Sequence, residues 1–224
     1  LSIWANGGIR TPIVYLSSDA RIKSVIGRTP EAAALETINK LRVTDYRMRD
    51  SVVQGTSPRR GFIAQEVEAI LPTAVTQRKG IVPDVYQSSE SVRFQERERT
   101  LSVAVKKPHG LSKGDWVRLI HDRKAETFEI VSIPGDTQFV VAGWETPVEK
   151  VFVYGRQVED LRSVNYEQIF ATGIAAIQEV NRKLDASNKR LQSEVATVRG
   201  ENARLNELVA SMMQRLESLE LRVQ

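Results

Sequence analysis

Residues 61–72 read GFIAQEVEAILP, a run that predicts a short amphipathic helix and the point at which it stops. Its apolar side chains recur at three- and four-residue spacing, which is typical of one buried helix face. Pro72 lacks the backbone N–H that a continuing helix needs, so we expect a helix over 62–71. Glu66 and Glu68 fall mostly on other faces, where a solvated surface is the simpler expectation.

Another helix is predicted upstream of this run. Thr29 can cap it, Pro30 suits the first helical position and Glu31 meets the positive helix end. Apolar residues then recur at helical spacing as far as Leu41. Residues 1–17 combine glycines, a proline and an alternating apolar run, which predicts a turn followed by a short strand.

The character of the sequence changes near residue 100. Residues 87–100 are polar and dense in alternating charge, so we expect a linker or an exposed crossing there. Short runs rich in β-branched and aromatic residues then alternate with turn signals. The runs are 101–105, 116–120, 127–131, 138–141 and 150–154. Strands this short at nearly regular spacing predict a small antiparallel barrel or sandwich, an SH3-like barrel being one form.

A heptad repeat occupies the end of the chain. The period is predicted to return to helical at about Val158, and from Leu184 the heptads are unbroken. Core position d holds Leu184, Leu191, Val198, Leu205, Met212 and Leu219, and core position a holds Asn188, Val195, Asn202, Val209, Leu216 and Val223. A repeat sustained this long predicts a coiled coil over 184–224, and Val or Asn at a with Leu at d is typical of parallel dimers.

Composition narrows the class of protein. The chain has 224 residues, enough for one or two domains with a core, and no cysteine, which excludes disulfides and thiolate metal sites. Its 32 basic and 28 acidic side chains nearly balance, so a nucleic-acid partner is not expected. No apolar run approaches the ~20 residues that span a bilayer, and no membrane partner is expected. The chain lacks an initial Met and the layout of a signal peptide, so it reads as a sequence that begins mid-chain.

No cofactor or metal site stands out. A phosphate-binding loop, zinc-ligand spacing and a paired-carboxylate site are all lacking in the sequence, so neither a cofactor nor a metal is expected.

Residues 17–23 read SSDARIK and put a hydroxyl, Ser18, five residues before an amine, Lys23. A serine hydroxyl is a poor nucleophile unless a base removes its proton. Lysine can be that base when it is neutral, a form that burial and a neighbouring cation both favour. His109 and His121 lie in the predicted β region and are expected to be sheet or loop residues, not bases. A Ser-Ser-Asp sequence alone is ordinary turn chemistry.

Three segments in this order resemble a known family: SSDARIK at 17–23, GFIAQEV at 61–67 and NYEQIF at 165–170. The family is that of the C-terminal intramolecular chaperones of phage tail spikes and tail fibres, the endosialidase-type self-cleaving chaperones. The resemblance covers roughly 17–86 and 163–224, so the stretch between looks like an insertion. Because it interrupts an otherwise contiguous family pattern, its two ends are expected to lie close together. It implies an α+β fold: a mixed helical and β chaperone core, an inserted small antiparallel β-barrel-like module and a long C-terminal α-helical coiled coil.

The resemblance divides the chain into parts with different expected roles. They are the end of an upstream fibre or stalk (1–17), the first part of the chaperone core (18–86), the inserted β module (87–157), a core helix (158–183) and the coiled coil (184–224).

The resemblance also implies a self-cleavage site between Ser17 and Ser18. Ser18 would attack the carbonyl before it, with Lys23 of the same or the partner chain as base, and water would resolve the ester. Asp19 could orient Lys23 or cap a turn, the cap being the simpler expectation. Arg21 could hold the oxyanion or make a structural salt bridge.

The implied function is an intramolecular chaperone with single-turnover serine endopeptidase activity. It would trimerise through the coil, fold the upstream fibre domain of the same polypeptide, and release itself. The expected location is the host cytoplasm during virion assembly, with release from the mature tail after cleavage. The residue types of the heptads favour a dimer, whereas the resemblance implies a homotrimer. We expect the trimer, because a fused fibre would impose its own three-fold symmetry. A lysine desolvated only between protomers would make cleavage follow correct assembly.

Two other functions stay open. The β module could be a receptor- or glycan-binding module presented on the coil, although its aromatic side chains more often fill a core. The candidate surface is Trp116, Phe139, Trp144 and Tyr154. The myelin regulatory factor group, membrane-associated self-cleaving transcription-factor precursors, has a similar motif, but nothing here resembles a DNA-binding domain or a membrane span.

Overall fold

The structure, a computed structural model, describes residues 17–223. Side chains are described for residues 17–216 and for Ser218. The stalk expected for residues 1–17 therefore lies outside the described residues, apart from Ser17. The α+β class is as predicted: a large antiparallel sheet is combined with a long C-terminal helix.

The chain divides into two compact units. The first comprises residues up to Ile26 together with Lys40–Gln168. The second comprises Gly27–Asn39 and the residues from Ile169 onward.

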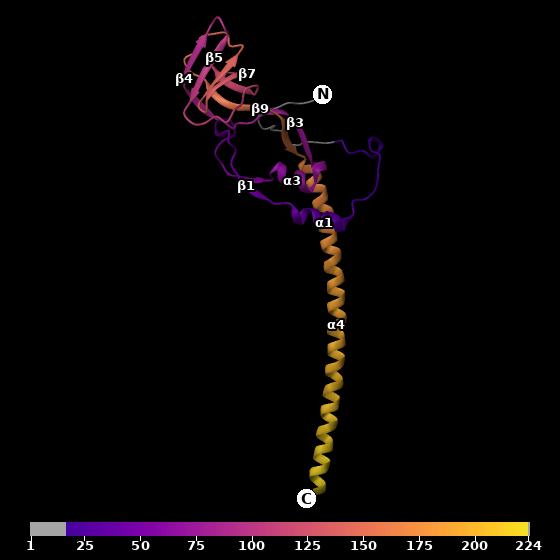
Figure 1. Cartoon of the computed structure of the whole chain (residues 1–224). Coiled ribbons are helices and arrows are strands. Elements are labelled where there is room, and N and C mark those ends of the chain that lie inside the picture. Colours follow the sequence, from indigo (N-terminus) through magenta and orange to yellow (C-terminus); the bar gives the residue numbers. More distant parts are fainter. Residues whose placement is uncertain (1–16, 224) are drawn as a thin grey trace. The chain divides into compact units, whose positions relative to one another are not determined.

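The first unit is built on seven antiparallel strands in the order β3-β9-β4-β5-β8-β7-β6. Figure 1 labels β3, β4, β5, β7 and β9 among them. Their bounds are β3 Val75–Ile81, β4 Gln87–Gln95, β5 Thr100–Val105, β6 Trp116–His121, β7 Lys124–Gly135, β8 Gln138–Ala142 and β9 Phe152–Val164. Strand β6, at the end of this order, also pairs with β9. The six strands β9, β4, β5, β8, β7 and β6 therefore form a closed circuit of pairings. Strand β3 stands outside this circuit and pairs only with the later part of β9.

The core of this sheet is formed by alternating side chains. Strand β5 shows the period of two clearly, because every second residue from Leu101 to Val105 is buried. Phe139 and Trp144 are fully buried in the same cluster. The four runs predicted between residues 101 and 141 as strands are strands β5 to β8, because their local pattern matches their burial.

Two predictions made for this region are wrong. Residues 87–100 are not a linker: strand β4 occupies 87–95, and its Val92 and Phe94 pack on the core while polar neighbours face outward. Residues 158–164 are not helical either, because β9 continues to Val164 and pairs with β3. Apolar residues three apart in 158–164 imitate a helical period, and pairing with a distant strand overrides it.

Short elements complete the first unit before the sheet. Strands β1 (Thr44–Tyr46) and β2 (Arg59–Gly61) pair antiparallel and enclose helix α2 (Ser51–Gln54). Helix α3 spans Ala64–Ile70, inside the predicted 62–71. A 3-10 turn at Pro72–Ala74 then ends the helical path, as the proline predicts.

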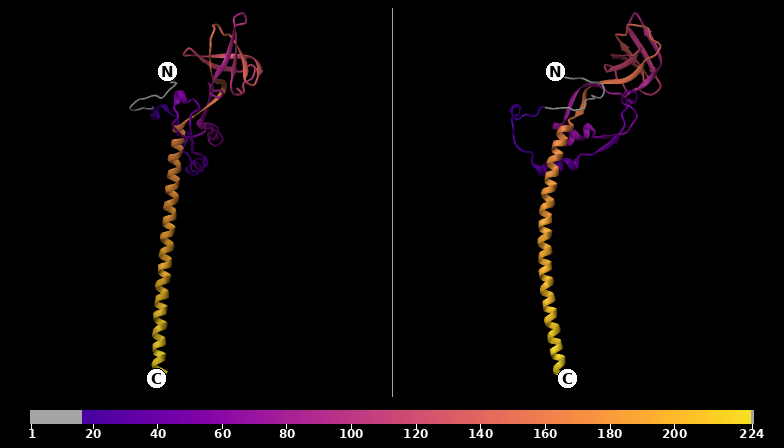
Figure 2. Two further views of the ribbon diagram at one scale, coloured as in Figure 1. Left: turned by 90° about the vertical axis from the view of Figure 1, so that its left-hand side faces the viewer. Right: turned by 180° about the vertical axis from the view of Figure 1, so that it is seen from behind.

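The second unit is built from helix α1 (Glu31–Lys40) and helix α4 (Tyr166–Val223), whose first three residues belong to the first unit. Ala34 of α1 is buried against Ala175 and Ala176 of α4. Beyond this contact α4 continues as one uninterrupted helix (Figure 2). Its apolar heptad side chains from Leu184 to Leu216 are exposed in the single chain. No described helix combines the length and the apolar character needed to cross a membrane.

Candidate active site

A single 3-10 turn, Ala20–Ile22, brings the predicted nucleophile and base together. Asp19 caps this turn by accepting a hydrogen bond from the backbone N–H of Arg21 at 2.8 Å. The backbone N–H of Lys23 donates to the carbonyl of Ala20 and closes the turn. The Lys23 Nζ then lies 2.5 Å from Ser18 Oγ and donates a hydrogen bond to it. A lysine and a serine five residues apart thus meet through local backbone geometry alone.

Asp19 and Arg21 pair with each other beside this contact. The Arg21 guanidinium donates to both carboxylate oxygens of Asp19, with Nη2 to Oδ2 at 2.7 Å. The guanidinium, followed by the Arg21 backbone N–H, lowers the pKa of the Asp19 carboxyl below its usual value. The sequence left two roles open for each residue. In the structure Asp19 caps the turn and Arg21 forms a salt bridge with it.

The segment that carries Ser18 and Lys23 is open to solvent in the single chain. Every residue from 17 to 30 is exposed, including the apolar Ile22, Val25 and Ile26. Lys23 donates to Ser18 in this arrangement. A general-base step needs the reverse, with the hydroxyl donating to a neutral amine, and burial is what favours a neutral amine.

The second and third segments of the family pattern meet in the structure, although the insertion separates them. The Tyr166 hydroxyl lies 3.4 Å from the backbone N of Phe62, and the two rings are 5.8 Å apart. A Cβ placed on Gly61 would lie 2.8 Å from the same hydroxyl oxygen. Glycine leaves room for this close approach, whereas a larger residue would push the hydroxyl away, which gives the glycine of the GFIAQEV segment a physical role.

Further contacts join the two halves around α3. Glu68 accepts hydrogen bonds at 2.6 Å from Arg162 of β9 and from Gln77 of β3. These two donors, Arg162 first, lower the pKa of Glu68. Gln168 donates to the Thr73 hydroxyl at 2.7 Å. The Glu68 side chain stays 31% exposed, in line with a partly solvated position, but its ion-pair partner lies 94 residues away in sequence and was not predicted.

A buried carboxylate links the core to the β module, and no local pattern in the sequence predicted it. Asp50 accepts hydrogen bonds at 2.9 Å from the hydroxyls of Tyr86 and Tyr154 and at 3.0 Å from the Val53 N–H. Burial opposes ionisation of Asp50, but the hydrogen bonds from Val53, Tyr154 and Tyr86 outweigh it and lower its pKa. Burial and the Asp50 carboxylate together raise the pKa of Tyr154 to about 12.

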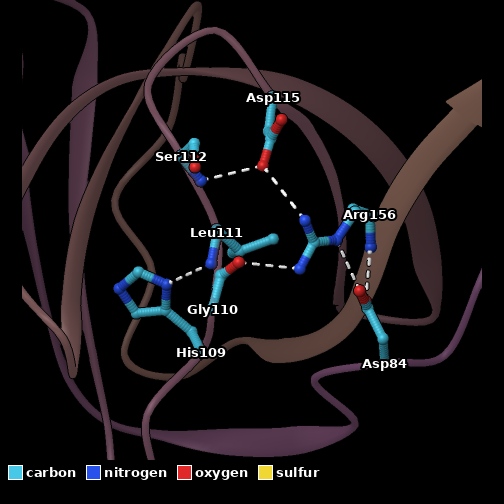
Figure 3. A network of polar contacts seen from close by, with 7 residues as sticks. All are labelled: Asp84, His109, Gly110, Leu111, Ser112, Asp115 and Arg156. Atoms are coloured by element: carbon cyan, nitrogen blue, oxygen red, sulfur yellow. Dashed lines mark hydrogen bonds and ion pairs between the residues drawn. The ribbon is translucent and has the colours of Figure 1, made fainter.

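Another polar network fixes a loop of the β module, and Arg156 of β9 is its centre (Figure 3). The guanidinium donates to Asp84 at 2.5 Å and to the carbonyl of Gly110 at 2.7 Å, and it lies 3.6 Å from Asp115. Asp115 in turn accepts the Ser112 N–H at 2.8 Å. These contacts hold the loop after β5 against β9, so we assign the network a structural role.

Both histidines lie in the β module, as predicted. His109 is buried, accepts the Leu111 N–H on Nδ1 at 2.9 Å and places Nε2 3.2 Å from the carbonyl of Gly135. His121 belongs to β6 and stacks beside Trp144. Within residues 17–223, no group of three or more His, Asp or Glu side chains could hold a metal ion.

The aromatic side chains suggested as a binding surface do not form one. Phe139 and Trp144 are buried in the core, and the Tyr154 hydroxyl is bonded to Asp50. Trp116 alone of the four is largely exposed. The alternation of β8 points Phe139 inward, which is the core role expected more often for such residues.

Comparison with known proteins shows similarity over part of the chain. Residues 18–76 match a peptidase-family model described as "Chaperone of endosialidase". Myelin regulatory factor homolog 1 of Caenorhabditis elegans is 39% identical over 79 residues, which make up 33% of this chain and 8% of that protein. The chain therefore spans a small part of that relative. The family match supports a chaperone of endosialidase type for this region.

Proposed function

We propose that the chain is an intramolecular assembly chaperone that cuts itself between Ser17 and Ser18. The observation that carries the proposal is the 2.5 Å contact between Lys23 Nζ and Ser18 Oγ. Both residues fall inside the region that matches the chaperone family, and the match begins at Ser18, the residue that cleavage would leave as a new N-terminus.

The proposed chemistry is an acyl shift followed by hydrolysis. Lys23, when neutral, takes the proton from Ser18 Oγ, and the oxygen attacks the carbonyl carbon of Ser17. The peptide bond breaks as the Ser18 nitrogen accepts the proton, which leaves the Ser17 carbonyl joined to Oγ as an ester. Water then attacks the ester, so that Ser17 ends as a carboxylate and Ser18 regains its hydroxyl.

Assembly is the proposed trigger. Desolvation between protomers favours the neutral amine that the reaction needs. The exposure of residues 17–30, with three apolar side chains among them, leaves this segment available for such burial. The heptad side chains of α4 supply the association through a homotrimeric coiled coil.

The partner of the chaperone is proposed to be the fibre or spike domain that precedes it in the same polypeptide. A coil that registers three chains raises their effective concentration, which assists a fibre of high contact order. The proposed location is the host cytoplasm during virion assembly, followed by release from the tail. The β module, for which we propose a small barrel, is an insertion into this chaperone.

Mass spectrometry of the purified chain tests the cleavage. The wild-type chain is expected to lose the peptide that ends at Ser17, whereas Ser18→Ala and Lys23→Ala should stay whole because they lack the nucleophile or the base. Ser17→Ala is the matched control: it changes the other serine of the pair and should still be cut. Cleavage that survives Ser18→Ala would rule out the assignment.

A further inference from the structure

The first turns of α4 have two apolar faces. Ala175 and Ala176 pack against α1 on one side. At 3.6 residues per turn, Phe170, Ile174 and Ile177 lie on the opposite side of the helix. These three side chains are 70%, 43% and 58% exposed. We call them the seam head.

The seam head continues the heptad register upstream of Leu184. Ile177 and Phe170 lie one and two heptads before Leu184, so they occupy d positions. Ile174 lies two heptads before Asn188, so it occupies an a position. The continuous repeat indicates that whatever covers the heptad face of α4 downstream also covers the seam head.

The residue types of the seam head differ from those of the coil below it. Ile at both a and d favours trimers or tetramers, whereas Val or Asn at a with Leu at d favours dimers. Ile174 and Ile177 meet the first description. The next two a positions, Asn181 and Asn188, are polar, so the head holds consecutive apolar layers that the following turns lack.

We propose that the seam head packs against the same residues of two further copies of this chain and sets the three-chain stoichiometry on which self-cleavage depends. This inference rests on the proposed function and names the surface that regulates it. The distal coil from Leu184 onward then strengthens association between the chains without determining how many associate. The head lies on the turns that α1 covers from the other side, and α1 is joined to the Ser18–Lys23 segment by residues 24–30.

The test converts the seam head to the residue types of the distal coil. Ile174→Val with Ile177→Leu gives Val at a and Leu at d while keeping an apolar helix face. Sedimentation equilibrium on the full chain with Ser18→Ala should give a mass of three chains, and the head variant in that background should give two. With Ser18 restored, the head variant should be cut at least tenfold more slowly than the wild type.

A distal variant is the matched control. Leu205→Val with Val209→Ala alters one d and one a position of the coil by similar small steps. It should dissociate at higher protein concentration than the wild type, yet remain a trimer and be cut at the wild-type rate above that concentration. A head variant that stays trimeric, or a distal variant that alone changes the stoichiometry, would overturn the proposal.

The outcomes separate this inference from the function on which it rests. If the wild type is a trimer that is never cut, or if Ser18→Ala is still cut, the proposed cleavage chemistry is wrong. The masses from sedimentation equilibrium still test whether the seam head sets the number of chains. If the head variant becomes dimeric and is cut at the wild-type rate, the head sets stoichiometry but does not control cleavage, and that part of the proposal is wrong.

Discussion

Ser18 and Lys23 were accessible to sequence reasoning because their contact is local. Five residues and one turn separate them, and Asp19 in between has the side chain that caps such a turn. Asp50 offered no comparable signal. Its partners Tyr86 and Tyr154 lie 36 and 104 residues away, and only the folded chain brings their hydroxyls to one carboxylate.

The buried Asp50 carboxylate makes stability depend on pH. Its pKa in the folded chain is held below the usual 3.8, so its contribution is present above 3.8 and is lost as the pH falls from there through the lower folded-state pKa. Asp50→Asn should therefore be less stable than wild type by about 2 kcal/mol at pH 7. The difference in the free energy of unfolding between wild type and Asp50→Asn should become smaller when urea unfolding is repeated from pH 5 down to pH 3.

The exposed Asp122 provides the control for that series. Asp122→Asn should leave the free energy of unfolding within about 0.5 kcal/mol of the wild type at pH 7. A gap between wild type and Asp50→Asn that stays constant from pH 5 to pH 3 would contradict the role given to the Asp50 charge.

Among the elements, those with a clear local period were predictable and those defined by pairing were not. Helix α1 has Pro30 and Glu31 at its start, helix α3 is followed by Pro72, and strand β5 carries its own alternation. Strand β4 is rich in charge, and the later part of β9 has apolar residues three apart. The later part of β9 is a strand because it pairs with the distant β3. Strand β4 pairs with the next strand, β5, and at its start with the distant β9, so its charge-rich sequence alone does not reveal it.

The start of α4 contacts the end of β2 where the Tyr166 hydroxyl approaches Gly61 so closely that an added side chain would have to displace it. Gly61→Ala should destabilise the chain by about 1–3 kcal/mol, because the new methyl group would meet the Tyr166 hydroxyl oxygen 2.8 Å away. Tyr166→Phe removes that oxygen. The double variant should recover most of the loss, as measured by urea unfolding followed through circular dichroism. Additive effects of the two changes would exclude a direct clash as the cause.

At the scale of the whole molecule, the β module leaves and rejoins the core at neighbouring points. The Val82 N–H donates to the Arg156 carbonyl at 2.9 Å, and the Tyr86 N–H donates to the Tyr154 carbonyl at 3.0 Å. The sequence predicted close ends from the way the insertion interrupts the family pattern, but not the residues at which they meet.

Excision of the module tests whether it is dispensable for self-cleavage. Replacing residues 83–155 with Asn-Gly would join Val82 to Arg156 through a two-residue hairpin turn that keeps the β3–β9 register. Asp50→Ala should accompany it, because the excision removes part of the Asp50 cluster. We expect a soluble chain that is still cut after Ser17, as seen by mass spectrometry.

A deletion one residue longer is the control for the excision. Removing residues 83–156 shifts β9 by one position and sends its inward side chains to the other face. That chain should fold poorly or aggregate. If both deletions behave alike, register in the β3–β9 pair does not govern folding of the core.

The meeting of Phe62 with Tyr166 also has a consequence for the order of folding. The two residues are 104 positions apart, and closing a loop costs entropy that grows with the logarithm of its length. Once the β module has folded, the Val82–Arg156 hydrogen bond leaves only about 30 free residues in that loop, which lowers the closure cost by about 1 kcal/mol. A module that folds first thus removes most of the entropy cost that its own length adds, and the two halves of the core can close as though they were neighbours in sequence.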